Sequence, residues 1–438
     1  MKEKNSKFYL KCKKCSAEIQ DFSVWFTNKQ VCKCGSKQVN VFYYENIENI
    51  KKLISKEENP KNVFHYFDFL PLLDKKNIVS KGEGIIPLER WNFLENYAKE
   101  KFNIKIKVYA YRNDKNPATE TFKDVAASVV ASVLKENKIK NYSVASTGNI
   151  GTAFSSYLAE ANISLNAFLP EDALKNNEAE MSIYGQRIFK VKGDYQKAKE
   201  IANEFSEKYN ILLSGGNFDP MRIEAKKTMV FEWLRILGEV PNVYIQALSG
   251  GTGPFAIEKA HTDLEKTDLF KELPRFILVQ PDKCDPMAQA YQKAKNNNFP
   301  KDFENDYPIL KNPKTEIPTL ATGNPATYPE MSKLVKKSNG DIISFEEEKI
   351  IDVGRLVAYE TGITIGPAAA IAVGGFFKSL KENLIFENDK IIINIGEGVK
   401  RASKFMEEMI YTTKNISNIE SCKPFNRENF KKILWDNL

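Results

Sequence analysis

Short apolar runs alternate with longer amphipathic stretches over most of the chain from about residue 100 onward. The short runs are rich in β-branched residues and carry few charges, as strands buried on both faces of a sheet do. The longer stretches repeat their apolar positions every three to four residues, which is typical of helices with one buried face. This alternation predicts parallel α/β sheets covered by helices.

The expected elements follow one another without an internal repeat at a fixed period. The expected strands are Ile106–Tyr111, Tyr142–Ala145, Leu165–Leu169, Arg187–Val191, Ile211–Leu213, Val243–Leu248, Phe276–Val279 and Ile391–Ile395. Helices expected between them include Asp124–Lys135, Tyr195–Lys208 and Ile223–Leu237. The stretch Lys293–Lys314, rich in Asn, Lys, Asp and Pro, predicts an exposed connection.

Residues 1–44 form a unit of another kind, in which cysteines are concentrated. A C-x2-C pair and a C-x-C pair lie within the first 34 residues, flanked by short strand-like runs. The four cysteines are Cys12, Cys15, Cys32 and Cys34. Four thiolates can close a tetrahedral zinc site and fold a segment too small for a core of its own. We therefore expect a structural zinc ribbon; the alternative is a Lys-rich tail with four free thiols.

Composition narrows the class of protein. The chain has 438 residues, 42% hydrophobic and 28% charged, which is the balance of a soluble globular protein of two or three domains. Its 64 Lys and Arg exceed its 57 Asp and Glu by only 7, and no basic stripe with interleaved aromatics is present. The excess suits anionic small molecules better than nucleic acid. With only two histidines, His-based triads and multi-His metal sites are disfavoured.

The sequence also bears on where the protein acts. The first 15 residues are charged and lack the apolar stretch of a signal peptide, and no run of about 18 apolar residues occurs anywhere. We therefore expect a cytoplasmic protein with no membrane contact. In a reducing compartment, clustered cysteines point to metal rather than to disulfides.

The first candidate for chemistry is Lys123, in the run Thr119–Asp124 just before the apolar helix Val125–Leu134. A lysine at the mouth of an apolar helix can be partly desolvated, which lowers its pKa and makes its amine nucleophilic. Its neighbour Asp124 lies where a carboxylate favours the helix dipole and can cap the turn. Taken alone, the motif is better explained as a surface lysine whose stem packs at a helix start.

Two further loops have the composition of anion sites. The loop Ala145–Gly151 joins a strand to a helix, where hydroxyls and free backbone N–H groups can bind a carboxylate or phosphate. The loop Ser249–Pro254 follows another strand, and its glycines allow a nest of N–H groups around phosphate oxygens. It is neither a Walker A motif nor a complete G-x-G-x-x-G loop. An ordinary capped turn, with Ser146 or Thr147 as N-cap, and a plain glycine-rich turn are the alternatives.

These three patterns, in this order, resemble the threonine synthase family of fold-type II pyridoxal-phosphate enzymes. The resemblance covers roughly residues 8–405, and an amino-terminal cysteine ribbon is common in the family. Further similar segments are Gly82–Leu88 (G-E-G-x-T-P-L), Met221–Thr228 (R-x-E-G-Q-K-T), Gly323–Ala326 (G-N-P-A-S) and Gly396–Lys400 (T-G-H-G-L-K).

The resemblance implies two parallel-sheet α/β domains behind the zinc-ribbon-like segment 1–44. Residues 45–125 would begin the large domain, 126–229 would form a smaller mobile α/β domain, and 230–438 would complete the large cofactor-binding domain. The oligomeric state stays open, with a homodimer as one option.

The resemblance also implies a role for each motif. Lys123 would hold pyridoxal 5′-phosphate as a Schiff base and move protons at the substrate α-carbon. Asn149 would contact the cofactor's ring hydroxyl, and Ser146 and Thr147 the substrate carboxylate. The cofactor phosphate would be bound by Ser249, Gly250, Gly251, Thr252 and Gly253. The expected substrate is a small phosphorylated amino acid: O-phosphohomoserine and water would give threonine and phosphate.

Several positions depart from the family's motifs, which leaves the reaction open. Val125, Ile86 and Ile150 replace the family's Arg or Thr, and Ile395 stands where a hydroxyl residue would meet the pyridine nitrogen. An aliphatic side chain cannot hydrogen-bond that nitrogen, so either Asn394 or Glu397 supplies the contact or the ring stays unsupported.

Two alternative functions therefore remain open. One is a cysteate synthase-like β-replacement on O-phosphoserine, which makes smaller demands on the cofactor than threonine formation does. The other is a non-catalytic binding module. For the substrate phosphate, Arg222, Lys226 and Lys227 are the basic candidates, and either lysine is an alternative to Lys123 as the cofactor lysine.

Overall fold

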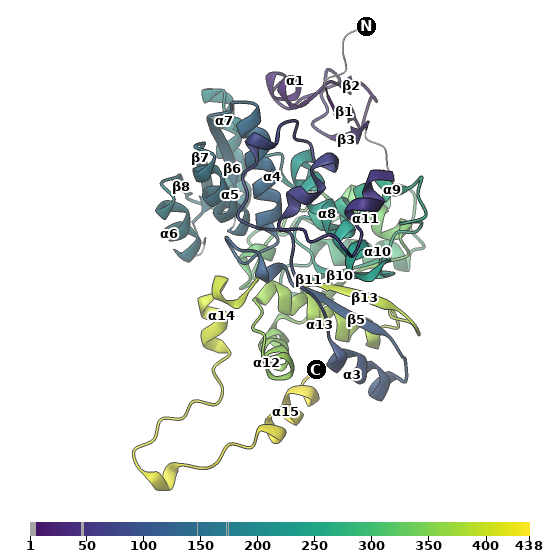
Figure 1. Ribbon diagram of the computed structural model, residues 1–438. Helices are drawn as coiled ribbons and strands as arrows, with labels where there is room; N and C mark the ends of the chain where they lie inside the picture. Colours follow the sequence, from purple (N-terminus) through teal and green to yellow (C-terminus); the bar gives the residue numbers. More distant parts are fainter. Residues whose placement is uncertain (1–5, 45–47, 147, 172, 174) are drawn as a thin grey trace.

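Three separate sheets organise the computed structural model, which describes residues 6–44, 48–146, 148–171, 173 and 175–438. The first is a small antiparallel sheet near the amino terminus, in the strand order β2-β1-β3. The other two are a four-stranded and a six-stranded sheet, both covered by helices (Figure 1). In the described residues, no helix is both long and apolar enough to span a membrane.

The amino-terminal sheet belongs to the cysteine-rich segment. Its elements are β1 (Phe8–Cys12), β2 (Glu18–Ile19), α1 (Phe22–Thr27) and β3 (Val39–Tyr43). Asp21 caps α1 by accepting a hydrogen bond from the Val24 N–H at 3.0 Å. Phe8, Leu10 and Trp25 are buried beneath these elements and join the hydrophobic core of the body, so the segment is docked on the protein rather than detached.

The four-stranded sheet is parallel throughout and has the order β8-β7-β6-β9. Its strands are β6 (Asn141–Ala145), β7 (Ser164–Pro170), β8 (Arg187–Val191) and β9 (Leu212–Leu213). The helices in this part of the chain are α4 (Lys123–Glu136), α5 (Asn149–Glu160), α6 (Lys175–Ile183) and α7 (Tyr195–Tyr209). The central strands β6 and β7 are buried on both faces, which explains their continuous apolar runs.

The six-stranded sheet has the order β12-β11-β10-β13-β5-β4, parallel except for the edge strand β4. Its strands are β4 (Leu88–Arg90), β5 (Lys107–Tyr111), β10 (Val243–Ala247), β11 (Arg275–Pro281), β12 (Asp341–Phe345) and β13 (Lys390–Asn394). One face packs against α3 (Asn92–Phe102), α12 (Ile350–Thr361) and α13 (Pro367–Lys381). The other packs against α8 (Pro220–Leu237), α9 (Thr252–Leu264), α10 (Pro286–Asn296) and α11 (Tyr328–Lys337).

The fold class predicted from the hydrophobic pattern is confirmed, and all eight expected strands are present with ends shifted by at most two residues. Two expectations need correction. The exposed connection begins later than Lys293, because α10 continues to Asn296. The helix expected from Ile223 begins at Pro220, where proline suits the first turn and Asp219 caps it by accepting from the Met221 N–H at 3.0 Å.

The carboxyl-terminal segment runs away from the body after α14 (Ser403–Glu408) and returns as α15 (Arg427–Asp436) (Figure 1). The returning helix packs on α3 and α13 through Trp435, whose ring stacks on Tyr97 at a centroid distance of 5.0 Å and meets Phe377 edge-on. The sequence pattern had not indicated this segment.

Candidate active site

The predicted loops meet at one cavity, at the carboxyl ends of β10 and β13 and the first turns of α4, α5 and α9. Ligands of open α/β sheets bind at such strand ends. The residues that line the cavity include Phe122, Lys123, Asn149, Asn217, Lys226, Gln246, Ser249–Gly253, Thr319, Asn394 and Glu397. The fold therefore brings together Lys123, Asn149 and the whole predicted glycine loop.

The loop between β5 and α4 carries Lys123 into this cavity. The Phe122 N–H donates to the Gly396 carbonyl at 3.0 Å, and Thr121 pairs with Glu397 in an isolated antiparallel bridge. These contacts tie the start of α4 to the segment that follows β13. Lys123 is thus held by two neighbouring strands of the six-stranded sheet, although it opens a helix beside the other sheet.

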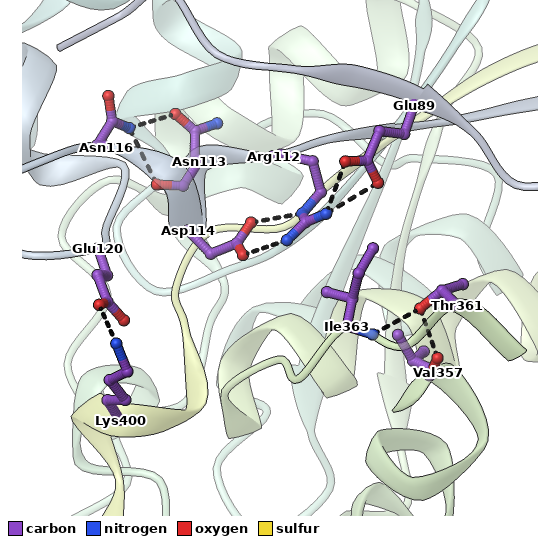
Figure 2. Close-up of polar contacts among 10 residues, drawn as sticks. All are labelled: Glu89, Arg112, Asn113, Asp114, Asn116, Glu120, Val357, Thr361, Ile363 and Lys400. Atoms are coloured by element: carbon purple, nitrogen blue, oxygen red, sulfur yellow. Dashed lines mark hydrogen bonds and ion pairs between the residues drawn. The ribbon is translucent and has the colours of Figure 1, made fainter. Parts of the chain in front are cut away.

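A cluster of charged residues fixes the outer part of the same loop (Figure 2). The buried Arg112 guanidinium donates to both Asp114 carboxylate oxygens at 2.8 and 2.7 Å, and to Glu89 at 2.8 Å. Farther along the loop, Lys400 donates to Glu120 at 2.9 Å. Bidentate pairing of this kind restricts the loop geometry more than a single contact would.

The electrostatic surroundings of Lys123 favour a free amine. Burial lowers the pKa of its half-buried side chain to about 8, the positive charge of Arg222 acts in the same direction, and Glu397 opposes both. At neutral pH roughly a tenth of the amine is then unprotonated, far more than for an ordinary lysine. This matches the lowered pKa expected from the sequence.

Asp124 caps the loop rather than the helix. Its carboxylate accepts from the backbone N–H groups of Ala118 and Thr119, both at 2.9 Å. Burial raises its pKa to about 6, although these bonds pull the other way. The expectation that Asp124 caps a turn therefore holds for the turn before α4, and its side chain braces the approach to Lys123.

In the loop after β6, the Ser146 side chain bonds to the loop itself. The buried Ser146 hydroxyl accepts from the N–H groups of Gly148 at 3.0 Å and Gly151 at 3.1 Å, and donates to the Gly148 carbonyl. It does not line the cavity. Its contacts hold the loop in shape, and the contact with a substrate carboxylate stays a prediction. Thr147 lies outside the described residues.

The glycine loop between β10 and α9 lies so close to neighbouring side chains that two of its glycines could not carry a Cβ. A Cβ on Gly250 would lie 1.7 Å from Asn217 Nδ2, and one on Gly253 would lie 2.1 Å from Gln246 Oε1. Thr252 donates to Asn217 at 2.7 Å, which fixes that amide beside the loop. The backbone therefore borders the cavity at the N-terminus of α9, where free N–H groups favour an anion.

Gly251 is needed for its backbone conformation and for its contact with the core. Its φ of +79° lies in the left-handed region, and a Cβ there would lie 2.0 Å from Met331 Cε and 3.5 Å from Leu248 Cδ1. A side chain would thus strain the backbone and collide with the apolar core, not fill the space for a phosphate. At Gly250 and Gly253, by contrast, a Cβ would meet the side chains of Asn217 and Gln246, which line the cavity.

Ile395 does not reach the cavity. Its side chain is fully buried in the core beneath α13, whereas its neighbours in sequence, Asn394 and Glu397, line the cavity. Asn394 accepts from Asn113 at 2.7 Å and contacts Gln246 at 3.4 Å. The alternation of side chains at the end of β13 therefore places polar groups on the cavity side, and the aliphatic residue is no obstacle there.

Glu397 forms a hydrogen-bonded pair with Asn149. Its carboxylate accepts from Asn149 Nδ2 at 2.7 Å and from the Ala368 N–H at 3.0 Å. Burial raises its pKa, while these bonds lower it. The pair joins the first turn of α5 to the segment after β13 and presents one carboxylate and one amide to the cavity.

The three basic candidates for a substrate phosphate have different environments. Lys226 lines the cavity. Lys227, next to it on α8, lies outside the cavity and pairs with Glu224 at 2.5 Å and Asp263 at 2.6 Å. Arg222 is buried, its Nε has no hydrogen-bond partner among the described residues, and its charge acts on Lys123.

Three polar residues of the cavity were not indicated by the sequence. These are Asn217, Gln246 and Thr319. Gln246 could have been found, because a polar residue near the carboxyl end of a buried strand, just before a glycine loop, is unusual. Asn217 and Thr319 lie shortly before the segments Met221–Thr228 and Gly323–Ala326 but outside them, and no local pattern marks them.

The four clustered cysteines form a second candidate site, away from the cavity. Their sulfur atoms all lie within 4.8 Å of one another, with Cys12–Cys34 and Cys15–Cys32 separations of 3.6 Å. Thiolates at these distances can act as four ligands of one metal ion. The predicted ligand set is therefore brought together.

Comparison with known proteins adds a family to this geometry. The model of the pyridoxal-phosphate dependent enzyme family matches residues 79–396. A protein named threonine synthase from Methanocaldococcus jannaschii is 29% identical over 396 residues, covering 89% of this chain and 92% of that protein. Another of that name from Halalkalibacterium halodurans is 28% identical, covering 76% and 88%.

Solved structures share the fold at lower identity. A threonine deaminase isoform from Solanum lycopersicum matches with a TM-score of 0.60 and 16% identity, covering 83% of this chain and 89% of that one. A cysteine synthase from Entamoeba histolytica matches with a TM-score of 0.58 and 17% identity, covering 81% and 93%. The fold thus serves several reactions, and the site has to distinguish among them.

Proposed function

The chain belongs to the pyridoxal-phosphate dependent enzyme family, and we propose that it acts as a threonine synthase-like lyase that converts O-phosphohomoserine and water into threonine and phosphate. One observation carries the proposal: the amine of Lys123, with its lowered pKa, faces the same cavity as the glycine loop at the N-terminus of α9. Relatives named threonine synthase that cover most of the chain support this reaction. Family membership also disfavours the alternative of a non-catalytic binding module.

The residues around the cavity fit pyridoxal 5′-phosphate. Gly250 and Gly253 border the cavity without side chains, because a Cβ at either would meet Asn217 or Gln246, and free backbone N–H groups at the start of α9 suit a phosphate there. Lys123 would hold the aldehyde carbon, and Asn149 would contact the ring hydroxyl. Asn394 or Glu397, the polar groups that face the cavity from the segment after β13, would meet the ring nitrogen.

The residues of this chain would then divide the remaining work. When bound, the cofactor supplies an electron sink for negative charge at the substrate α-carbon. Lys123, once its amine is free, can accept and return a proton at that carbon, because its pKa lies close to neutral. For the leaving phosphate of the substrate we assign Arg222, whose charge acts on Lys123 and whose buried Nε has no hydrogen-bond partner among the described residues, although it is not among the residues that line the cavity.

In the amino-terminal segment we propose one structural zinc ion bound by Cys12, Cys15, Cys32 and Cys34. All four ligands would come from the protein, which leaves no open position for catalysis. The substrate would be a small phosphorylated amino acid, met in the cytoplasm.

Phosphate release from candidate substrates tests the reaction. Purified protein loaded with cofactor should release phosphate from O-phosphohomoserine and form threonine, and Lys123→Ala protein should not. Release from O-phosphoserine with sulfite, and none from O-phosphohomoserine, would favour the cysteate synthase-like reaction instead. No release from either substrate would refute a phosphorylated substrate.

A further inference from the structure

Two adjacent lysines on α8 are equally buried but have opposite surroundings. Lys226 is 1% exposed and Lys227 is 0% exposed. The ammonium group of Lys227 lies 2.5 Å from Glu224 and 2.6 Å from Asp263, so its charge is neutralised by two carboxylates. In the part of the chain that the structure describes, Lys226 makes neither a hydrogen bond nor an ion pair, and its one polar contact is with the ring face of Phe122, 3.8 Å from the centroid.

A buried ammonium group without a carboxylate beside it is energetically costly. Burial lowers the pKa of Lys226 well below its ordinary value, and the positive charges of Lys123 and Arg222 lower it further. Removing one member of a buried ion pair is costly because the remaining charge has lost both water and partner. Lys226 has no carboxylate beside it among the described residues, so an anion bound in the cavity would stabilise its protonated form.

The place where that anion would sit is bordered by the glycine loop. The Phe122 ring beneath the Lys226 amine also abuts the loop, since a Cβ on Gly253 would lie 3.3 Å from Phe122 Cε1. Lys226, Gly253 and the first turn of α9 line the same cavity. A side chain with a formal positive charge and a helix N-terminus with free N–H groups therefore face one space, as expected for a doubly charged ligand.

We propose that Lys226 is the cationic contact for a phosphate dianion seated on the glycine loop Ser249–Gly253. This inference rests on the proposed function only in that the cofactor carries such a phosphate; the substrate's phosphate is the other source of the same chemistry. The position of Lys226 beside the loop favours the cofactor, while Arg222 is available for the substrate. The segment similar to R-x-E-G-Q-K-T has Lys226 where that motif has Gln, so Lys226→Gln is a natural test substitution.

The test compares cofactor binding with and without the phosphate group. Protein stripped of cofactor is titrated with pyridoxal 5′-phosphate and, separately, with pyridoxal, and binding is followed by visible absorbance. We expect Lys226→Gln and Lys226→Met to weaken pyridoxal 5′-phosphate binding by about 10- to 100-fold, the effect of losing one charge-assisted contact. Pyridoxal binding should be unchanged, and Lys226→Arg should recover part of the loss. Lys99→Gln, which removes an exposed charge on α3, is the matched control.

Two further measurements identify the source of the phosphate. Calorimetric titration of the stripped protein with inorganic phosphate should show weaker binding in Lys226→Gln. If cofactor binding is unchanged but KM for a phosphorylated substrate rises in the loaded variant, the substrate supplies the phosphate. Equal losses for pyridoxal and pyridoxal 5′-phosphate, or no change in any of these measurements, would overturn the proposal. If the proposed reaction fails, the comparison of pyridoxal 5′-phosphate with pyridoxal still tests Lys226, because these binding measurements require no turnover.

Discussion

Two clusters of buried charge lie on either side of α8 and differ in their balance. On the side facing the amino-terminal segment, Lys227 and Lys259 meet Glu224 and Asp263, so cations and carboxylates match. The Tyr43 hydroxyl of β3 donates to Glu224 at 2.7 Å and completes this cluster. On the cavity side, Arg222 lowers the pKa of Lys123, and both lower the pKa of Lys226. Glu397 acts in the opposite direction on Lys123, and Asp219 on Arg222, but no carboxylate acts on Lys226 in the part of the chain that the structure describes.

The two clusters show two different roles of buried charge. A balanced cluster is complete by itself and joins parts of the structure, here β3 to α8 and α9. An unbalanced cluster is complete only with something of the opposite charge, and perturbed pKa values in a cavity are a physical reason to look for a functional site.

The largest effect is expected at Lys123. Lys123→Ala removes both the covalent anchor of the cofactor and the proton carrier, so turnover should fall by about 1,000-fold or more. Borohydride reduction of the loaded wild-type protein, followed by peptide mapping, should place the cofactor on Lys123. Recovery of the cofactor on Lys226, which faces the same cavity, would show that Lys123 is not the anchor.

The second effect concerns the segment that covers the balanced cluster. Replacing Cys12 and Cys15 by serine should abolish metal binding, because zinc affinity requires the complete thiolate set. Metal analysis of protein purified without chelator should give one zinc per chain in the wild type and none in the variant. Proteolysis should then cut the segment before β3 first, as its core is too small to fold alone. A wild-type protein without zinc would refute the assignment.

The third prediction contrasts the two neighbouring lysines directly. Lys227→Met leaves Glu224 and Asp263 undercompensated, and the free energy of unfolding should drop by about 3–5 kcal/mol. Lys226→Met removes a buried amine that makes no hydrogen bond or ion pair with the described residues, so the cofactor-free protein should be as stable as the wild type or slightly more stable. Denaturant unfolding of both cofactor-free variants measures this. Similar losses in the two variants would show that the clusters do not differ as described.

Much of this arrangement could be predicted from the sequence, because parallel strands buried on both faces give continuous apolar runs and the loops after them carry the chemistry. The order of Lys123, the Ser146 loop and the Ser249 loop located the cavity. The direction of individual side chains could not be predicted. Ile395 points into the core, and a Cβ at Gly251 would point at Met331. Adjacent helix positions point about 100° apart, so without the partners of Lys226 and Lys227 their roles were indistinguishable.

The last prediction is a pH dependence on the unbalanced side. Capture of the cofactor aldehyde needs the free amine of Lys123, whose pKa is lowered to about 8, mainly by burial. The capture rate of cofactor-free protein should therefore rise with pH, by about tenfold between pH 7 and pH 9, and level off above that range.

Glu397 opposes this lowering, because its negative charge stabilises the protonated amine. Glu397→Gln should thus move the midpoint of the rate profile to lower pH, whereas Arg222→Gln, which removes the cation that lowers the pKa of Lys123, should move it to higher pH. Stopped-flow absorbance at several pH values measures both profiles. Shifts in the same direction would mean that these two charges do not act on Lys123 as the geometry requires.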